Sequence, residues 1–208
     1  MADDLWIDKG TFKVLSHEDK IRTIRRRLTA SSFAAAMGLC KFTTQDELVD
    51  KIEKRTEPKP MNEDMKRGIE LEGYVITLYT NYTRNTVINS TFGVPHNDKR
   101  IGGIPDGLVC QDGMVEIKCP KRIYRALFYE ECMVDPKKYI FPSHYIQMQG
   151  YLAIFDRKWC DYVVYSHSEQ LLKIIRIYRN KQYWDKIVYP KLCDFMITHL
   201  GWEDDLDF

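Results

Sequence analysis

The apolar and polar positions in the first third of the chain follow a helical period. "RLTASSFAAAMGLCK" combines an alanine-rich run with Thr29 or Ser31 as a cap and Gly38 as a terminator, which predicts a short helix. "TTQDELVDKIEKRT" carries a capping box, Thr44 with Glu47, and therefore predicts a second helix that "EPKP" ends. We expect two short helices in this part of the chain.

A longer helix is expected from about Asn62 to Tyr82. Its apolar residues recur at the spacing of one helical face, which would pack on the core. The residues expected on this face are Met65, Ile69, Val75, Ile76 and Tyr79.

From Thr86 onward the period changes to that of strands. "TVINSTFGV", "RIGGIPDGLV" and "GMVEIKC" are short, rich in β-branched residues and interrupted by Gly, Asn, Pro and Asp. A DG turn within "CQDGM" would join the last two strands. We therefore expect a strand meander in the middle of the chain.

The last third alternates between helices and strands. After a polar, aromatic connection, "PSHYIQMQGYLAIFD" predicts a helix, and "CDYVVYS" and "LLKIIRIYR" predict strands. "NKQYWDKIVYPKLCDFMITHL" predicts a final helix that Pro190 interrupts or kinks. This order of elements describes an α/β or α+β domain in which helices flank one central mixed β-sheet.

Length and composition fit one domain. A chain of 208 residues with 44% hydrophobic residues can bury one sizeable core. We expect a single domain over residues 1–208, with N-terminal helices in 1–60, a core in 61–178, and a C-terminal helix and acidic tail in 179–208.

The charge is balanced in total but uneven along the chain. With 31 basic and 30 acidic residues the net charge is +1, which argues neither for nor against a nucleic-acid partner. Positive charge concentrates in "KIRTIRRR" and "KCPKRIYR", whereas the C-terminal "GWEDDLDF" is acidic. A locally basic surface on a nearly neutral protein is therefore expected.

The six cysteines show neither a CxxC pair nor a short regular spacing, which argues against a zinc ribbon or a disulfide framework and favours reduced thiols. The first thirty residues contain no apolar core, and no window of the chain approaches the roughly 18 apolar residues of a membrane span. We expect no signal peptide, no membrane span and an intracellular, reducing compartment.

Three charged residues stand inside an otherwise apolar strand pair, "GGIPDGLVCQDGMVEIKCPK". On a strand, Glu116 and Lys118 share one face, while Val115 and Ile117 point to the other. Asp106 would lie beside them, at one edge of the sheet, if the strand that follows it pairs with theirs. Neighbouring carboxylates in a half-buried place repel each other, and a hard divalent cation relieves that repulsion.

Such a site suits hydrolysis of a phosphodiester. Mg²⁺ takes one or two carboxylates together with a backbone carbonyl, which Ile117 could offer, and with water and phosphate oxygens. The cation lowers the pKa of a bound water and stabilises transition-state charge. Lys118 would position that water or help to deprotonate it, with a pKa that the cation and partial burial lower.

A plainer interpretation fits the same residues. "VEIK" also fits a solvated strand face with an ion pair, and "PDG" fits an ordinary turn. The spacing D-x9-E-x-K, with both halves in apolar strands, is the PD-(D/E)xK pattern and favours the active site.

Five blocks extend the pattern over residues 22–165: "RLTASSF", "RGIELEGY", "PDGLV", "VEIKCP" and "YIQMQGYL". In this order they resemble the phage lambda-type exonucleases, also called the YqaJ-like viral recombinase family. The resemblance implies a restriction-endonuclease-like core and a viral or phage nuclease, usually a 5′ to 3′ exonuclease on linear duplex DNA for recombination or end-processing. It implies Mg²⁺, with Mn²⁺ as a substitute, and DNA with a free end as substrate.

The resemblance also implies roles for individual residues. Asp106 and Glu116 match the metal-binding acids of the family, and Ile117 stands in the place of its carbonyl donor. Lys118 matches the catalytic lysine. Glu72, on the predicted long helix, matches an acidic residue of the active site and is a further catalytic and metal-binding candidate.

Two more helices carry expected site residues. Glu70 lies two residues before Glu72 and, on a helix, points to another side. "YIQMQGYL" places Gln147 where the family keeps an active-site glutamine, with Tyr151 one helical turn further on. Of these two we assign Gln147 to the site.

Phosphate contacts are expected from the first block and the basic run before it. Ser31 would lie near a helix N-terminus, where a hydroxyl and free N–H groups bind phosphate. Arg22, Arg25 and Arg27 would contact the DNA backbone, although a cap and a solvated basic face fit the same residues. Ile104 replaces a polar residue of the phage pattern, which leaves a preference for 5′-phosphate ends open.

Other classes of function stay open at this point. An endonuclease of the same fold, or a Cas4/RecB-like nuclease, would share the core; an iron–sulfur version needs a close set of cysteines, which the intervals of 28 and 33 residues between the last three do not supply. A catalytically silent DNA-binding module would have no need of the charged trio. A single-strand annealing protein is a candidate partner, and either a monomer or a ring trimer is compatible with the sequence. A viral protein would act in the cytoplasm or nucleus of its host.

Overall fold

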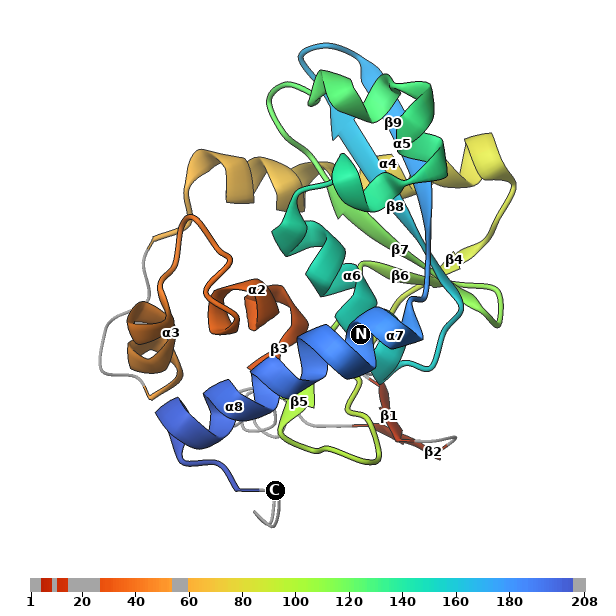
Figure 1. Cartoon of the computed structure of the whole chain (residues 1–208). Helices are drawn as coiled ribbons and strands as arrows, with labels where there is room; N and C mark the ends of the chain where they lie inside the picture. The colour runs from red at the N-terminus through yellow and green to blue at the C-terminus, as the bar shows by residue number, and fades with distance from the viewer. Residues whose placement is uncertain (1–4, 9–10, 15–26, 54–59, 204–208) are drawn as a thin grey trace.

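The computed structural model describes residues 5–8, 11–14, 27–53 and 60–203. Its centre is a five-stranded mixed sheet with strand order β4-β6-β7-β8-β9, and helices cover both faces (Figure 1). The strands are β4 Val87–Ile88, β6 Gly107–Val109, β7 Gly113–Lys118, β8 Trp159–Ser166 and β9 Leu171–Tyr178. The expected α/β class with a central mixed sheet is confirmed.

The pairing of the strands makes β7 the central strand. β6 and β7 are antiparallel, β8 runs parallel to β7, and β9 returns antiparallel to β8. The parallel connection from β7 to β8 is made through helix α6, Pro142–Ile154, as a parallel pair requires. The charged trio was expected at an edge of the sheet, which was wrong: it lies in the middle, where β6 begins and β7 ends.

Helix α4, Glu63–Thr83, covers one face of the sheet (Figure 1). The side chain of Asn62 caps it by accepting a hydrogen bond from the backbone N–H of Met65. Val75 and Tyr79 are buried against the sheet as expected. Met65 and Ile69, expected on the same face, are 54% and 63% exposed, because the first turns of α4 extend beyond the strands.

The other face is covered by α6 and by two further segments. The first consists of η1, Ala30–Ser32, and α2, Phe33–Ala36; the second is α8, Tyr189–Leu200. Pro190 does not break the C-terminal helix. The wide turns of η4, Trp184–Val188, precede it and follow α7, Lys181–Tyr183.

The N-terminal part of the chain contains the two expected short helices, α2 and α3 (Gln45–Ile52), and in addition strands that the sequence did not predict. β1, Leu5–Asp8, and β2, Thr11–Val14, form a hairpin that the sequence did not predict. β3, Leu28–Thr29, pairs in parallel with β5, Ile101–Gly102, so β5 is not part of the meander. Helix α3 begins at the predicted capping box.

Two predictions from local sequence signals, a helix cap and a turn, were wrong. η1 and α2 begin without a side-chain cap, so the Thr29 and Ser31 hydroxyls do not cap them. The loop between β6 and β7 spans three residues, with the positive φ at Cys110, and Gly113 is the first residue of β7. Gly113 is needed there because a Cβ would lie 2.1 Å from the ring of Trp159.

The polar, aromatic connection between β7 and α6 folds into three short turns: η2 Arg125–Phe128, α5 Glu130–Val134 and η3 Pro136–Lys138. All six cysteines are free thiols, as expected. Within the described part of the chain, no helix has the length and apolar character to cross a membrane.

Candidate active site

The pairing of β6 with β7 brings Asp106 to the strand of Glu116. Gly107 lies opposite Val115, so Asp106, one residue before β6, reaches the last residues of β7. Its Oδ2 accepts a hydrogen bond of 2.6 Å from the backbone N–H of Ile117. The predicted juxtaposition of these two segments is confirmed, and the hydrogen bond fixes the carboxylate of Asp106.

Glu116 and Lys118 point to the same face of β7, as the alternation of a strand requires. Glu116 is only 1% exposed, and the Nζ of Lys118 lies 2.5 Å from its Oε1. The other oxygen, Oε2, is buried and accepts no hydrogen bond from the described residues. A buried carboxylate oxygen without a donor is costly, and a cation would satisfy it.

The site raises the pKa of its carboxyl groups. Burial raises the pKa of Glu116 to about 7, although the charge of Lys118 opposes the shift. Burial likewise raises the pKa of Asp106, against Lys118 and the N–H of Ile117. A further positive charge beside them would therefore stabilise the ionised form of both carboxyl groups.

The pKa of Lys118 is raised, where the sequence led us to expect a lowered value. Burial alone would lower it, but the carboxylates of Glu116 and Asp106 outweigh burial. Lys118 therefore holds its proton in this arrangement, and only an added cation beside the carboxylates would weaken that hold.

Glu72 faces the same charges from α4. Its side chain is half-buried, and its pKa is raised by burial and by the charge of Asp106, while Lys118 opposes the shift. Glu70, two residues earlier, is exposed. The separation expected between these two residues of one helix is therefore confirmed.

Helix α6 closes the site from the other side. Gln147 donates a hydrogen bond of 2.9 Å from Nε2 to the hydroxyl of Tyr151. Tyr151 is buried, and burial and then the charge of Glu116 raise its pKa well above the usual value. Gly103 leaves room for the ring of Tyr151, because a Cβ there would lie 2.6 Å from the ring.

His144 belongs to the same face of α6, one turn before Gln147, and the sequence analysis did not single it out. Its Nδ1 lies 2.7 Å from the hydroxyl of Tyr162, which β8 contributes. Burial and the charge of Lys118 lower its pKa to about 4. The spacing of three residues from Gln147 was the signal that could have found it.

The residues present fit a cation held by few protein ligands. Among the described residues, no three His, Cys, Asp or Glu side chains are grouped closely enough to hold a metal ion by themselves. Mg²⁺, however, is usually bound through one or two carboxylates and keeps water or phosphate oxygens as further ligands. Asp106 and Glu116 supply such a pair; the Ile117 carbonyl and Glu72 stay predicted ligands.

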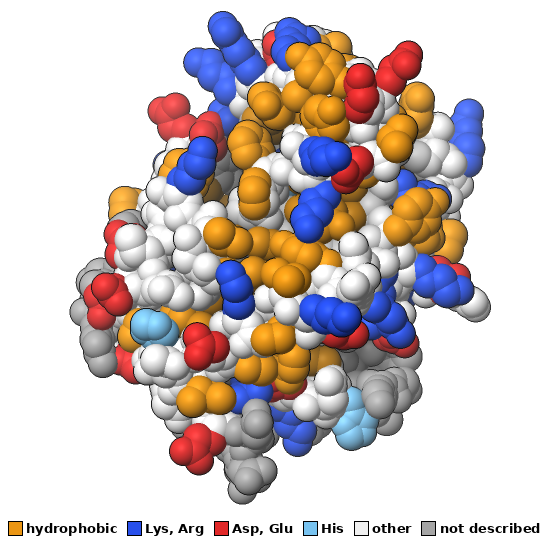
Figure 2. Space-filling view, in the orientation of Figure 1, with side chains coloured by type: hydrophobic (Ala, Val, Ile, Leu, Met, Phe, Trp, Pro, Cys, Tyr) orange, Lys and Arg blue, Asp and Glu red, His pale blue; other side chains and the backbone are white. Residues whose placement is uncertain are grey.

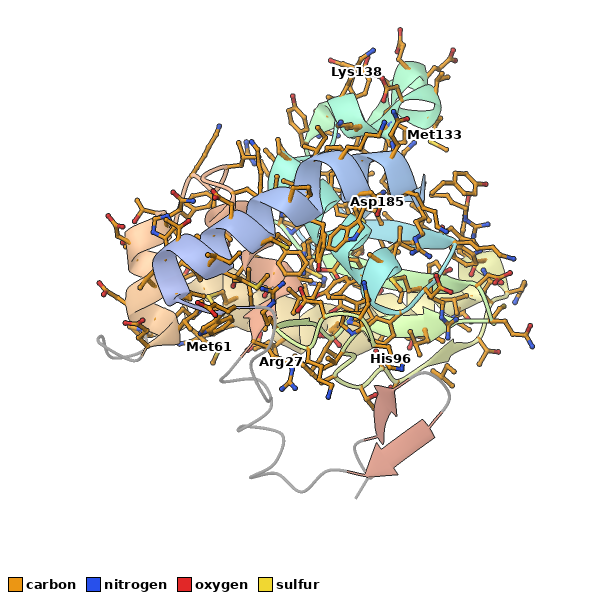
Figure 3. The ribbon with its side chains drawn as sticks, turned by 60° about the horizontal axis from the view of Figure 1, so that its bottom comes forward. Arg27, Met61, His96, Met133, Lys138 and Asp185 are labelled. Atoms are coloured by element: carbon orange, nitrogen blue, oxygen red, sulfur yellow. The ribbon has the colours of Figure 1, made fainter. Side chains whose placement is uncertain are left out.

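The predicted phosphate contacts are only partly described. Ser31 is exposed in η1, with its hydroxyl 3.2 Å from that of Thr29. Arg27, directly before β3, is 9% exposed, and burial lowers its pKa (Figure 3). Arg22 and Arg25 lie outside the described residues. The role of all of them in binding phosphate stays a prediction.

η1 lies close to the rest of the site. The Cβ of Ala30 lies 3.1 Å from the position of a Cβ at Gly103 and 3.4 Å from that of one at Gly150. Ser31 thus follows a residue that packs on the helix of Gln147. Ile104, two residues before Asp106, is 39% exposed.

Fold and site together define the class of the protein: the PD-(D/E)xK superfamily of nucleases, with Asp106, Glu116 and Lys118 at the ends of two paired central strands. The model of the YqaJ-like viral recombinase domain matches residues 20–158. The chain therefore belongs to the YqaJ-like viral recombinase family, whose structural relatives are of the lambda exonuclease type.

Solved structures share the fold. An alkaline exonuclease (LHK-Exo) from Laribacter hongkongensis is 24% identical with a TM-score of 0.70, and 88% of this chain matches 93% of that chain. LHK-Exo in complex with dAMP matches with 25% identity, a TM-score of 0.68 and the same coverage, 88% and 93%. A phage-related exonuclease from Haemophilus somnus 129PT is 18% identical with a TM-score of 0.64, covering 83% of this chain and 93% of that one. No curated protein matched the sequence.

Proposed function

We propose that the protein is a Mg²⁺-dependent DNA exonuclease that degrades one strand of linear duplex DNA from a free end, 5′ to 3′, in viral or phage recombination or end-processing. The observation that carries the proposal is the buried Oε2 of Glu116, which has no donor among the described residues and lies beside Asp106 and Lys118. Membership of the YqaJ-like family and similarity to exonuclease structures support the reaction class. The dAMP in a related structure supports a deoxynucleotide substrate.

Asp106 and Glu116 would hold the cation, with the Ile117 carbonyl and Glu72 as further candidates. When bound, Mg²⁺ supplies a water of lowered pKa and stabilises charge on the phosphate. Asp106 is held in place by the Ile117 N–H, so one ligand is oriented before any cation arrives. Tyr151 is buried beside the site, and the hydrogen bond from Gln147 restrains both side chains.

Lys118 would bind the scissile phosphate or the attacking water. Its side chain is a protonated ammonium in this arrangement, since the neighbouring carboxylates raise its pKa. An ammonium beside the reacting phosphate stabilises the negative charge that develops on the phosphate oxygens. Ser31, Arg22, Arg25 and Arg27 would hold phosphates further along the strand.

The decisive assay compares linear duplex DNA with covalently closed circles of the same sequence, each with Mg²⁺ or with EDTA. We expect nucleotide release from the linear DNA with Mg²⁺, and with Mn²⁺ in its place, and none from closed circles. Cutting of closed circles would show an endonuclease instead. Digestion in EDTA would contradict the cation mechanism.

Polarity is tested with duplexes labelled at one end and carrying either a 5′-phosphate or a 5′-hydroxyl. We expect loss of the 5′-terminal label first. Since Ile104 offers no hydrogen bond to a terminal phosphate, we expect the two ends to be degraded at similar rates. A 3′-terminal label that disappears first would refute the proposed direction.

Lys118→Ala tests the catalytic assignment. We expect the rate of hydrolysis to fall by about 10²-fold or more while DNA binding in EDTA is retained, because the ammonium acts on the reacting phosphate. Lys186→Ala is the matched control, an exposed lysine on η4. Equal rates for the two variants would remove Lys118 from the mechanism.

A further inference from the structure

A row of aromatic rings leads from the surface to the candidate active site. The ring centroids of Tyr124 and Phe141 are 5.6 Å apart, those of Phe141 and His144 5.5 Å, and those of His144 and Tyr162 5.7 Å. Tyr124 and Phe141 are 52% and 53% exposed, whereas Tyr162 is 2% exposed. We call these four residues the aromatic row.

The inner end of the aromatic row lies beside the charged trio. His144 stands one helical turn before Gln147 and contacts Tyr162 through its Nδ1. Tyr162 on β8 lies directly opposite Glu116 in the pairing of β8 with β7, so the two side chains are on the same face of the sheet. The inner end of the aromatic row is therefore next to the strand that carries Glu116 and Lys118.

The outer end of the aromatic row is rigidly held. Glu169, in the turn between β8 and β9, accepts a 2.7 Å hydrogen bond from the backbone N–H of Ile123 and a 2.8 Å hydrogen bond from Arg125. Both neighbours of Tyr124 are thus tied to the same carboxylate. Phe141 is the N-cap residue of α6, directly before its first residue, Pro142. Exposed aromatic rings on fixed backbone lose little conformational entropy when they bind a partner.

The surroundings of the outer end are both apolar and basic. Lys121, Arg122 and Arg125 are exposed on the segment that carries Tyr124. Figure 2 shows hydrophobic side chains gathered over the region of α5, with Lys and Arg side chains among and beside them. Met133 and Lys138 project from this α5 and η3 region (Figure 3).

We propose that Tyr124 and Phe141 form a stacking platform for unpaired bases of the DNA strand that enters the active site. Each base has a π-face that an aromatic side chain can cover, and the neighbouring cations match the phosphates between bases. Bases inside a duplex are already stacked on each other, so the platform binds nucleotides separated from the complementary strand. The aromatic row joins this platform to Tyr162, opposite Glu116 on the neighbouring strand, so we assign the occupant as the strand to be hydrolysed.

This inference rests on the proposed function, since it assigns the platform to the substrate strand of that reaction. A second copy of the chain is the other occupant that an exposed apolar surface could take. A protein partner would require no bases, whereas the platform binds an oligonucleotide only through them. A strand that lacks its bases but keeps the same number of phosphates therefore distinguishes these two occupants.

The test is binding of two labelled single strands of about ten nucleotides, one of thymidines and one of abasic sites, measured by fluorescence anisotropy in EDTA. For the wild-type protein we expect the thymidine strand to bind about 5- to 100-fold more tightly, the range that stacking of one base supplies. Tyr124→Ala and Phe141→Ala should bring this ratio toward one and leave the affinity for the abasic strand unchanged. Both residues are about half exposed, so the variants should fold.

Tyr82→Ala is the matched control, since Tyr82 is 77% exposed near the C-terminal end of α4. It should keep the wild-type ratio. A wild-type ratio near one, or an unchanged ratio in both platform variants, would overturn the inference. So would variants that dissociate an oligomer in sedimentation without changing the ratio, because the surface would then bind a second copy.

Digestion of linear duplex DNA, assayed in parallel, separates the two proposals. If the wild-type protein degrades linear DNA but binds the thymidine and abasic strands equally well, only the platform is refuted. Binding that depends on bases and on Tyr124, without any degradation, defeats the exonuclease and leaves the platform standing.

Discussion

Glu116 occupies the middle of the central strand, a position at which most sheets bury an apolar side chain. Its neighbours along the same face of β7 are Met114, which is buried, and Lys118. Within the described part of the chain only one of its oxygens has a donor, and that donor is the partly exposed ammonium of Lys118. The carboxylate is therefore a source of instability that a bound cation would relieve.

This instability depends on pH in a defined direction. Burial raises the pKa of Glu116 to about 7, so the folded protein binds this proton more tightly than the unfolded chain. Without a cation, the contribution is neutral below a pH of about 4.3 and destabilising above it. The free energy of unfolding should fall by up to about 3 kcal/mol between the unfolded and folded pKa values.

The measurement is urea unfolding in EDTA at several pH values. Glu116→Gln keeps the size of the side chain and cannot ionise, so its stability relative to the wild type should increase from pH 5 to pH 8. Glu70→Gln, an exposed change on α4, should show no such trend. A difference between Glu116→Gln and the wild type that stays constant with pH would contradict the raised pKa.

Addition of Mg²⁺ should reverse the trend. Cation binding requires ionised carboxylates, so the increase in Tm on adding Mg²⁺ should be larger at pH 8 than at pH 6. Asp106→Asn and Glu116→Gln should each abolish most of this increase. An equal increase in both variants would place the cation elsewhere.

Glu72 and Glu70 provide a matched pair on one helix. Glu72 is half-buried and its pKa responds to Asp106, whereas Glu70 is exposed. Glu72→Gln should slow Mg²⁺-dependent hydrolysis by about 10- to 100-fold, the usual effect of losing a group that supports a metal site. Glu70→Gln should digest DNA at the wild-type rate; equal loss in both variants would point to a general effect on α4.

At the scale of elements, α4 is joined to the sheet by a buried polar contact as well as by apolar packing. The hydroxyl of Tyr79 donates a 2.6 Å hydrogen bond to Asp161, which also binds the guanidinium of Arg176 at 2.8 and 2.9 Å. α4, β8 and β9 therefore meet at one carboxylate. This contact sets the position of the helix that carries Glu72.

Tyr79→Phe removes the hydroxyl and leaves the ring in place. Asp161 loses one of its donors while it stays buried, so the free energy of unfolding should fall by about 1.5–3 kcal/mol. Tyr82→Phe, on the exposed end of the same helix, should change it by less than about 0.5 kcal/mol. Denaturant unfolding of both variants measures the difference, and equal stabilities would show that the hydrogen bond is dispensable.

The elements were predictable where the signal is local. The capping box of Thr44 and the periodicity of α4, α6 and β8 gave helices and strands close to their observed bounds. β5 could not be assigned, because its partner β3 lies more than seventy residues away in sequence. The exposed side chains of Met65 and Ile69 also depend on how far the sheet extends, which a helical period does not contain.

The candidate site was predictable for a different reason. Asp106, Glu116 and Lys118 stand on two strands joined by a short loop, so their proximity follows from pairing alone. Glu72 and Gln147 came from the family resemblance, and their placement beside the trio needed the tertiary structure. His144 was missed although it precedes Gln147 by three residues, because only its contact with Tyr162 on β8 shows that it belongs to the site.

At the scale of the molecule, the C-terminal helix is tied to the middle of the chain. Asp98 and Arg100 form a buried ion pair with an N–O distance of 2.8 Å. The hydroxyl of Tyr189, at the start of α8, donates a 2.9 Å hydrogen bond to Asp98, and Arg100 donates one of 3.2 Å to the carbonyl of Trp202. α8 is therefore an integral part of the domain.

Asp98→Ala leaves the guanidinium of Arg100 without its buried carboxylate. The free energy of unfolding should fall by about 3–5 kcal/mol, which is the usual effect of removing one member of a buried pair. Asp185→Ala changes an exposed residue of η4 and should alter stability by less than about 0.5 kcal/mol (Figure 3). A small loss for Asp98→Ala would indicate that α8 docks through apolar contacts alone.

The pairing of β6 with β7 has a consequence for the safety of the cell that makes this protein. The two strands that bring Asp106 to Glu116 are also the strands on which the central sheet is built. A newly synthesised or damaged chain that has not formed this pair has no assembled site, and a slip of one residue would turn Glu116 and Lys118 toward α4. In a nuclease built in this way, the proposed site would form only together with the central sheet, so an incompletely folded molecule would not cut DNA.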